Sequence, residues 1–131
     1  MKPGTIRDLK AMLTGMAPKL SDRAWCFQPI HDAHFVPATA FAMIREEEGL
    51  CVIIPSEAAQ PDAPQFARIT LAIHSDLEAV GLTAAVSQQL ANSGIACNVI
   101  AGLHHDHLFV QFDRRDDAMT LLERLSLDAG R

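Results

Sequence analysis

The chain has 131 residues, of which 49% are hydrophobic, 21% charged and 5% aromatic. This length allows one compact domain or two small domains that share a core. Eleven basic and sixteen acidic side chains give a formal net charge of −5, and the sequence contains no basic run. Affinity for phosphate comes mostly from Lys and Arg, so we expect no nucleic-acid partner. We also expect no membrane partner, because no apolar stretch approaches the roughly 20 residues of a spanning helix.

The cysteines indicate a reducing compartment. Cys26, Cys51 and Cys97 are widely spaced and lie among apolar neighbours. An odd number of cysteines without a CxxC pair argues against a disulfide framework or a structural zinc site. The N-terminus also lacks the apolar region of a secretory signal peptide. The sequence therefore predicts free thiols and a cytoplasmic protein.

The first half begins with a helical pattern between residues 5 and 20. Apolar residues recur there at the spacing of one helix face, at Leu9, Met12, Leu13, Met16 and Leu20. Thr5 is the expected N-cap, and Pro18 should end the helix near Met16.

Short strands and polar connections follow this helix. The residues 46–49, Glu-Glu-Glu-Gly, have the composition of a hairpin turn with a solvated tip. The expected strands cover residues 24–27, 38–45 and 50–54, with a polar connection at 31–34. Residues 55–64 contain three prolines, so this stretch is the candidate linker near the middle of the chain.

The second half predicts the order β-α-β-β-α. The expected elements are a strand at 68–74, a capping box at 75–78, a helix ending at Ser93-Gly94, strands at 95–100 and 107–112, and a helix capped by Asp113. The buried stripe of the first helix is Leu82, Val86 and Leu90; that of the second is Ala118, Leu121, Leu122 and Leu125. This order is the ferredoxin-like βαββαβ unit without its last strand.

Signatures of common catalytic sites are absent from the sequence. There is no GxSxG, no P-loop, no GxGxxG and no HExxH, so we expect no enzyme of these classes. The most conspicuous polar cluster is His104-His105-Asp106-His107. Alternate residues of a strand share a face, so His105 could act with His107, or His104 with Asp106. A metal site would need further ligands from His74, His31, His34 or a second chain.

Three interpretations of this cluster stay open. It could be the hydrogen-bonded polar end of a hairpin, a metal site, or a ligand site that includes Asp106. A second candidate site is the connection from Ser75 to Leu82, which joins a strand end to a helix N-terminus. Free N–H groups and the helix dipole can receive a carboxylate there, and Gly81 permits close approach of a ligand or backbone.

These residues together resemble the ACT domain, a small regulatory module that binds amino acids. The resemblance lies in Val80-Gly81-Leu82, Leu90-Ala91, Gly94-Ile95, Asn98-Val99-Ile100 and the stretch from His105 to Val110. The last stretch is similar to the second unit of uncharacterised bacterial tandem ACT proteins, which distantly resemble CASTOR arginine sensors and aspartokinase regulatory domains. The first half is similar to the first unit in the helical pattern from Asp8 to Leu20, in Trp25-Cys26-Phe27 and in residues 45–50.

The resemblance implies an α+β fold with two ferredoxin-like ACT units side by side, at residues 1–60 and 61–131. It implies a non-enzymatic protein without a cofactor, commonly a homodimer, that holds an amino acid or related metabolite where units meet. The implied ligand contacts are Ser75, Asp76, Val80, Gly81, Leu82, Asn98, Val99, Ile100 and Asp106. Two positions depart from the family pattern: Val80 precedes the glycine of a loop that is usually Asp-x-Pro-Gly, and Cys51 stands where threonine is usual.

Two other functions stay open at this point. One is a structural or protein-interaction ACT module with a degenerate pocket. The other is a small metal-dependent enzyme built on His104, His105 and His107.

Overall fold

The computed structural model describes residues 6–131. Its elements in chain order are α1 (Leu9–Thr14), β1 (Pro18–Ile30), η1 (Ala33–Phe35), β2 (Ala42–Glu46), β3 (Gly49–Pro55), η2 (Ser56–Ala58), β4 (Phe66–Leu71), α2 (Leu82–Ala91), β5 (Asn98–Ala101), β6 (Asp106–Gln111), η3 (Phe112–Arg114) and α3 (Arg115–Ala129). Within the described range, no helix is long and apolar enough to cross a membrane.

The chain forms two compact units that do not follow its order. One contains the residues up to Ser21 together with Ala67–Arg131, and we call it the helical unit. The other is Asp22–Phe66, which we call the hairpin unit. The strand β1 contributes its first residues to the helical unit and the remainder to the hairpin unit.

The helical unit contains the predicted β-α-β-β-α order, realised as β4-α2-β5-β6-α3. Its strands lie in the order β1-β4-β6-β5, and β5 is antiparallel to β6. The edge beside β4, where a βαββαβ unit needs one more strand, is occupied by β1. The second half of the chain therefore lacks the last strand of a ferredoxin-like sheet, and β1, from the first half, takes its place.

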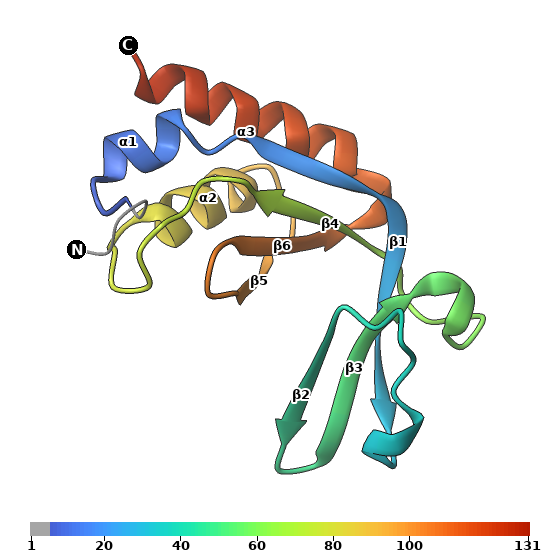
Figure 1. The fold of residues 1–131 in the computed structure, drawn as a ribbon. Helices are drawn as coiled ribbons and strands as arrows, with labels where there is room; N and C mark the ends of the chain where they lie inside the picture. The colour runs from blue at the N-terminus through green and yellow to red at the C-terminus, as the bar shows by residue number, and fades with distance from the viewer. Residues whose placement is uncertain (1–5) are drawn as a thin grey trace. The chain divides into compact units, whose positions relative to one another are not determined.

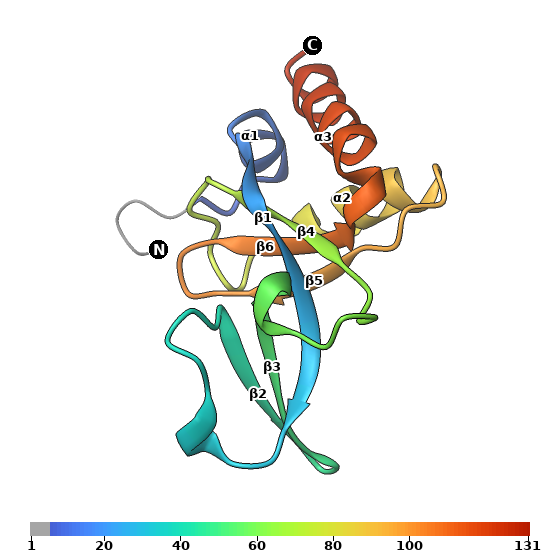
Figure 2. The ribbon, with the colours of Figure 1, turned by 90° about the vertical axis from the view of Figure 1, so that its right-hand side faces the viewer.

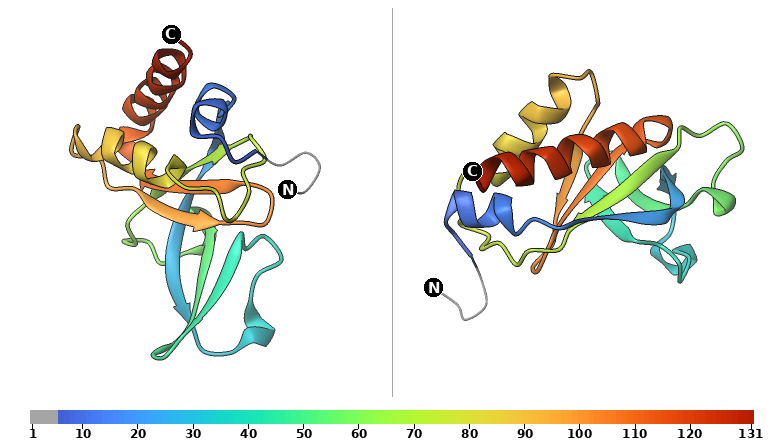
Figure 3. Two further views of the ribbon diagram at one scale, coloured as in Figure 1. Left: turned by 90° about the vertical axis from the view of Figure 1, so that its left-hand side faces the viewer. Right: turned by 90° about the horizontal axis from the view of Figure 1, so that it is seen from above.

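One hydrophobic core holds the helical unit together. The three helices pack on one face of the sheet (Figures 1 and 3), and their buried side chains meet the inward residues of the strands. In β4 the inward set alternates as Ala67, Ile69 and Leu71. The helices contribute Met12, Leu13 and Met16 from α1, Leu82, Val86 and Leu90 from α2, and Ala118 and Leu122 from α3.

The hairpin unit is an antiparallel sheet in which β3 lies between β1 and β2 (Figure 2). Glu46 pairs with Gly49, so the exposed Glu47-Glu48 tip forms a two-residue turn as predicted. Gly49 adopts φ +132°, a conformation that favours glycine. Trp25, Cys26 and the Val52–Ile54 segment supply the buried residues of this unit.

The first helix is much shorter than the periodic segment that predicted it. Asp8, whose carboxylate accepts the Ala11 N–H, begins α1, and Ala17 at φ +45° takes the chain out of the helix before Pro18. Leu20 therefore lies in β1, and β1 has 13 residues where the sequence indicated four. The expected Thr5 cap lies outside the described residues. The strand expected from residue 38 begins at Ala42, because Pro37 and its neighbours form a turn with the Ala40 N–H on the Pro37 carbonyl.

Two helix starts also differ from the prediction. The Ser75–Glu78 sequence does not cap α2, which begins after Gly81 with no side-chain cap among the described residues. Asp113 does not cap α3. It lies in the three-residue 3-10 turn η3, which directly precedes the helix. The loop of residues 72–81 precedes α2 and the short 3-10 turn η3 precedes α3, so each helix begins beyond the residue with the expected capping chemistry.

Candidate functional site

The loop between β4 and α2 is anchored at its first residues. Ser75 forms a parallel bridge with Ile6, and the Asp76 N–H donates to the Ile6 carbonyl at 3.0 Å. One carboxylate oxygen of Asp76 accepts the Glu78 N–H at 2.8 Å. These contacts hold the start of the loop against the N-terminal segment and leave Val80 exposed at its end.

Within residues 6–131, the helix α2 begins without a side-chain cap. Gly81 at φ +111° precedes the helix, and within the described chain no side chain caps it. The first intrahelical bond is from the Ala85 N–H to the Gly81 carbonyl, so the N–H groups of the first turn keep their positive dipole. The Leu82 side chain points into the core, so this residue offers a ligand its backbone and not its side chain.

Asp106 is half-buried at the start of β6, opposite Ala101 of β5. It has the same strand parity as Leu108 and Val110 and thus belongs to the helix-covered face. Burial raises the pKa of its carboxyl, and nearby His105 lowers it to a smaller degree. The β4–α2 loop and the β5–β6 turn lie at the same end of the helical unit in Figures 1 and 3. Asp106 and the start of α2 therefore share this end.

The predicted contacts on β5 do not share one face. The exposed Asn98 donates one of its two amide hydrogens to the Phe109 carbonyl at 3.2 Å. Val99 packs against the core, whereas Ile100 pairs with His107. The Leu82 side chain is buried in the core, and the partly buried Val99 side chain packs against it.

Four histidines gather at the same end of the helical unit. The ring centroids of His74 and His105 are 4.8 Å apart, those of His74 and His104 5.7 Å, and those of His105 and His107 6.4 Å. Among residues 6–131, no group of three or more His, Cys, Asp or Glu side chains has the arrangement of a metal site.

Hydrogen bonds tie part of this hairpin end together, whereas the buried His105 Nδ1 has no hydrogen-bond partner among the described residues. The Gly102 N–H donates to the His105 carbonyl at 2.9 Å, and His107 Nδ1 lies 2.9 Å from the Thr70 hydroxyl. Burial, followed by the charges of Arg68 and His105, lowers the pKa of His107. The sequence analysis did not name Thr70 as a partner of this cluster. Its position could have indicated this role, because Thr70 lies on the same side of the predicted strand as Arg68 and His74.

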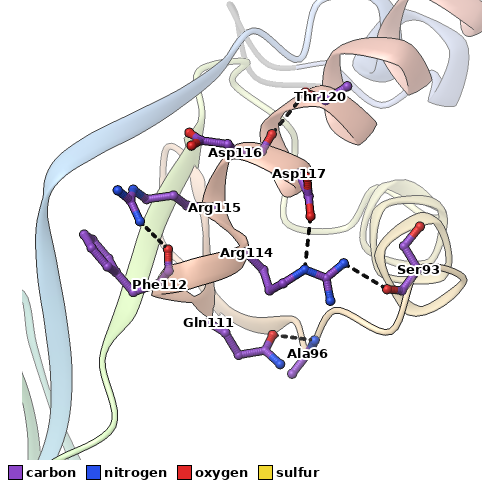
Figure 4. Close-up of polar contacts among 9 residues, drawn as sticks. All are labelled: Ser93, Ala96, Gln111, Phe112, Arg114, Arg115, Asp116, Asp117 and Thr120. Atoms are coloured by element: carbon purple, nitrogen blue, oxygen red, sulfur yellow. Dashed lines mark hydrogen bonds and ion pairs between the residues drawn. The ribbon is translucent and has the colours of Figure 1, made fainter.

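A recess of about 240 Å³ lies where α2 ends and α3 begins, lined by Ser93, Arg114, Asp117, Thr120 and Leu121. Figure 4 shows that the Arg114 guanidinium donates both to Asp117 and to the Ser93 carbonyl, each at 3.2 Å. Arg114 therefore links the segment after α2 to the first turn of α3 and lines the recess. No motif in the sequence pointed to it.

The cysteines are all free thiols in the described chain. Cys26 is buried as expected, whereas Cys51 and Cys97 are partly exposed. Burial raises the pKa of each thiol, and for Cys51 the carboxylate of Glu46 raises it further. At neutral pH they are protonated and poorly nucleophilic.

Comparisons with known proteins match the chain along most of its length. Two family models, each described as an ACT domain, match residues 4–68 and 67–124. A solved Vibrio cholerae protein of unknown function, described as a possible transport protein, is 37% identical; the match covers 86% of this chain and 92% of that one, with a TM-score of 0.76.

More distant structures share the fold. The alpha and beta subunits of an aspartokinase match at 10% identity over 82% of this chain and 95% of that one, with a TM-score of 0.58. A C-terminal regulatory domain of a Porphyromonas gingivalis aspartate kinase matches at 11% over 82% and 94%, with a TM-score of 0.54. No protein of curated function matches the sequence. The chain belongs to the ACT domain family, as a regulatory protein with two ACT domains in tandem.

Proposed function

We propose that this protein binds an amino acid or a related small metabolite at the end of the helical unit where α2 begins, and that it does so without catalysing a reaction. Two features at the same end of the unit support the proposal: the uncapped N-terminus of α2 and the half-buried carboxyl of Asp106. A free amino acid carries a carboxylate and an ammonium group, and these two features have the complementary charges.

The carboxylate binds the N–H groups of the first turn of α2, where the dipole favours an anion. The ammonium binds Asp106 in preference to Asp76. One oxygen of Asp76 already accepts the Glu78 N–H, whereas a cation beside Asp106 would offset the cost of burying its charge. Ser75, Val80 and Gly81 border the ligand, and Asn98, Val99, Ile100 and Leu82 position the backbone around it.

The remaining parts of the proposal follow from the family. The two ACT domains correspond to residues 1–60 and 61–131, and two chains form a homodimer. The free thiols support a reducing, cytoplasmic location. The absence of common catalytic motifs from the sequence supports a binding role rather than an enzymatic one.

A thermal-shift scan of the twenty amino acids at millimolar concentration tests the proposal. We expect at least one to raise the melting temperature of the wild type. Asp106→Asn should abolish this shift, whereas Asp76→Asn should retain most of it. If no amino acid stabilises the wild type, the proposal is wrong; if Asp76→Asn alone loses the shift, the ammonium contact is wrongly assigned.

The stability of the unliganded variant separates binding from folding. The folded-state pKa of Asp106 is raised above 3.8, so the folded chain holds this proton more tightly than the unfolded chain. The associated stability is present below pH 3.8 and is lost as pH rises through the folded pKa. At pH 7 the neutral Asp106→Asn variant should therefore be at least as stable as the wild type, and a lost ligand shift would not reflect unfolding.

The second candidate function is an interaction module without a ligand. The exposed side chains of Leu77, Val80 and Leu103 around the two loops favour it, because exposed apolar groups mark contact surfaces. Under this alternative no amino acid shifts the melting temperature, and Val80→Ser abolishes the capture of a partner.

A further inference from the structure

We infer that the imidazoles of His74, His104 and His105 bind a small tetrahedral oxyanion of the phosphate type, and that they do so in their protonated form. The site is formed within the helical unit, on the face of its sheet opposite the helices. It is separate from the proposed amino-acid site, because Asp106 and the start of α2 belong to the helix-covered side. Either site can therefore exist without the other.

The first argument is the arrangement of the three rings. Their centroids form a triangle with separations of 4.8 Å from His74 to His105, 5.7 Å from His74 to His104 and 6.4 Å from His104 to His105. The rings come from two segments, since His74 follows β4 and the other two lie in the turn before β6. A tetrahedral oxyanion presents three oxygens on one side, and each can accept an N–H from one ring.

Neighbouring side chains place these rings on the uncovered face. Ile73 is buried, and a Cβ atom at Gly15 of α1 would lie 2.9 Å from its side chain, so the next residue, His74, points the other way. Leu108 of β6 lies in the helix-covered core, so His107, one residue before it, also belongs to the uncovered face. The ring contacts place the two turn histidines beside them.

The charged side chains of this face are basic. Alternation along the described strands of the helical unit gives it Lys19 of β1 and Arg68 of β4, and no carboxylate. Burial lowers the pKa of His107, and the charge of Arg68 lowers it further. The positive charge of Arg68 therefore reaches the histidines, and it favours an anion beside them.

The nearby carboxylates lie elsewhere. Asp106 is on the helix-covered side of β6, although its charge interacts with His105. In the β4–α2 loop, the Asp76 carboxylate accepts the Glu78 N–H, and the Glu78 carboxylate lies 3.7 Å from the Arg7 guanidinium. Protonated rings at the separations given above repel one another, and a bound anion offsets this repulsion.

The second argument is an unsatisfied nitrogen within the cluster. The buried Nδ1 of His105 has no hydrogen-bond partner among the described residues. Buried polar atoms are nearly always paired, so this nitrogen needs a partner that these residues do not supply. The side chains of residues 6–131 do not have the arrangement of a metal site, which disfavours a cation as this partner. A protonated imidazole donates from both nitrogens, and an oxyanion accepts such bonds.

A sulfate titration followed by NMR tests the site. Sulfate is the probe because it remains a dianion between pH 5.5 and pH 8, the range in which histidines ordinarily change charge. At pH 5.5 and constant ionic strength, sulfate should shift the ring signals of the three histidines saturably, and its affinity should fall at least tenfold at pH 8. No saturable shift at pH 5.5, or equal affinity at the two pH values, would overturn the inference.

Substitutions test the location. His74→Gln removes an exposed ring, His105→Gln removes the ring with the unsatisfied nitrogen, and each should weaken sulfate binding at pH 5.5 at least fivefold. Lys10→Gln is the matched control, because it removes a positive charge from an exposed position of α1 on the helix-covered side. It should leave the affinity within twofold of the wild type. Wild-type affinity in both histidine variants, or an equal loss in Lys10→Gln, would show that sulfate does not bind this cluster. The melting temperature of each variant confirms that it is folded.

Discussion

Single residues decide the conformation of the loop end of the helical unit. Gly81 adopts φ +111°, and a Cβ atom there would lie 3.1 Å from the Leu9 side chain. The sequence predicted close approach at this glycine by a ligand or a backbone, and the neighbour in the structure is the side chain of α1. The same glycine sets the start of α2 and thus the position of the free N–H groups.

We expect Gly81→Ala to destabilise the protein by about 1–3 kcal/mol, because an L-residue in this region of φ is strained and its methyl group crowds Leu9. Urea unfolding followed by circular dichroism measures the change. Gly130→Ala is the matched control, since φ is −83° there and the nearest atom to a Cβ is 3.5 Å away. Equal effects of the two substitutions would show that backbone strain at Gly81 is unimportant.

His107 should make the protein sensitive to mild acid. Its folded-state pKa lies below 6.5, so the unfolded chain binds this proton more readily. The associated stability is present above pH 6.5 and is lost as pH falls through 6.5 toward the folded pKa. We expect His107→Gln, which keeps a hydrogen-bonding group near Thr70, to lose less stability than the wild type on acidification.

The measurement is the melting temperature of both proteins between pH 7.5 and pH 5.5. Proton NMR identifies the His107 ring signal as the one that the variant lacks. A His107 titration midpoint at or above 6.5 would contradict the explanation.

Elements with a strong apolar stripe were predicted well, and elements without one were not. The helices α2 and α3 match their expected stripes, because Leu82, Val86, Ala118 and Leu122 are all buried against the same sheet. The first helix carried a similar pattern but ended early, because Ala17 at φ +45° takes the chain out of the helix and Leu20 lies in β1. A single apolar residue at the end of a helical pattern does not show whether it belongs to the helix or to the next strand.

We expect Leu122→Ala to cost about 2–5 kcal/mol, because it removes a fully buried side chain from the core between α3 and the sheet. Leu127→Ala on the same helix removes the same atoms from a side chain that is 67% exposed and should change stability by less than about 0.5 kcal/mol. Chemical unfolding of the two variants checks the difference. Similar losses would mean that α3 is not packed as described.

The whole molecule combines segments that are distant in the sequence. The residues up to Ser21 fold with Ala67–Arg131, and α1 supplies Met12, Leu13 and Met16 to that core. The family models instead divide the chain near residue 67, in its linear order. A repeat in the sequence and a compact unit in space are therefore different divisions of this chain.

We expect a fragment of residues 61–131 to be unfolded or molten by itself. It lacks three buried residues of α1, each worth about 2–5 kcal/mol, and the strand beside β4, against a typical total stability of about 5–15 kcal/mol. Far-UV circular dichroism and NMR dispersion test this, and a peptide of residues 1–30 added in trans should restore structure. A fragment that unfolds cooperatively without the peptide would contradict the prediction.

The sequence by itself determined the α+β class, the β-α-β-β-α order of the second half and the ACT resemblance, because these depend on local periodicity, turn residues and short motifs. It also predicted a ligand site at residues 75–82 and Asp106, which remains a prediction. Only the tertiary structure decided that β1 completes the helical unit and that Leu82 and Val99 face the core. It also brought His74 against His105. Those outcomes depend on strand pairing and side-chain packing between distant residues, and no local pattern encodes them.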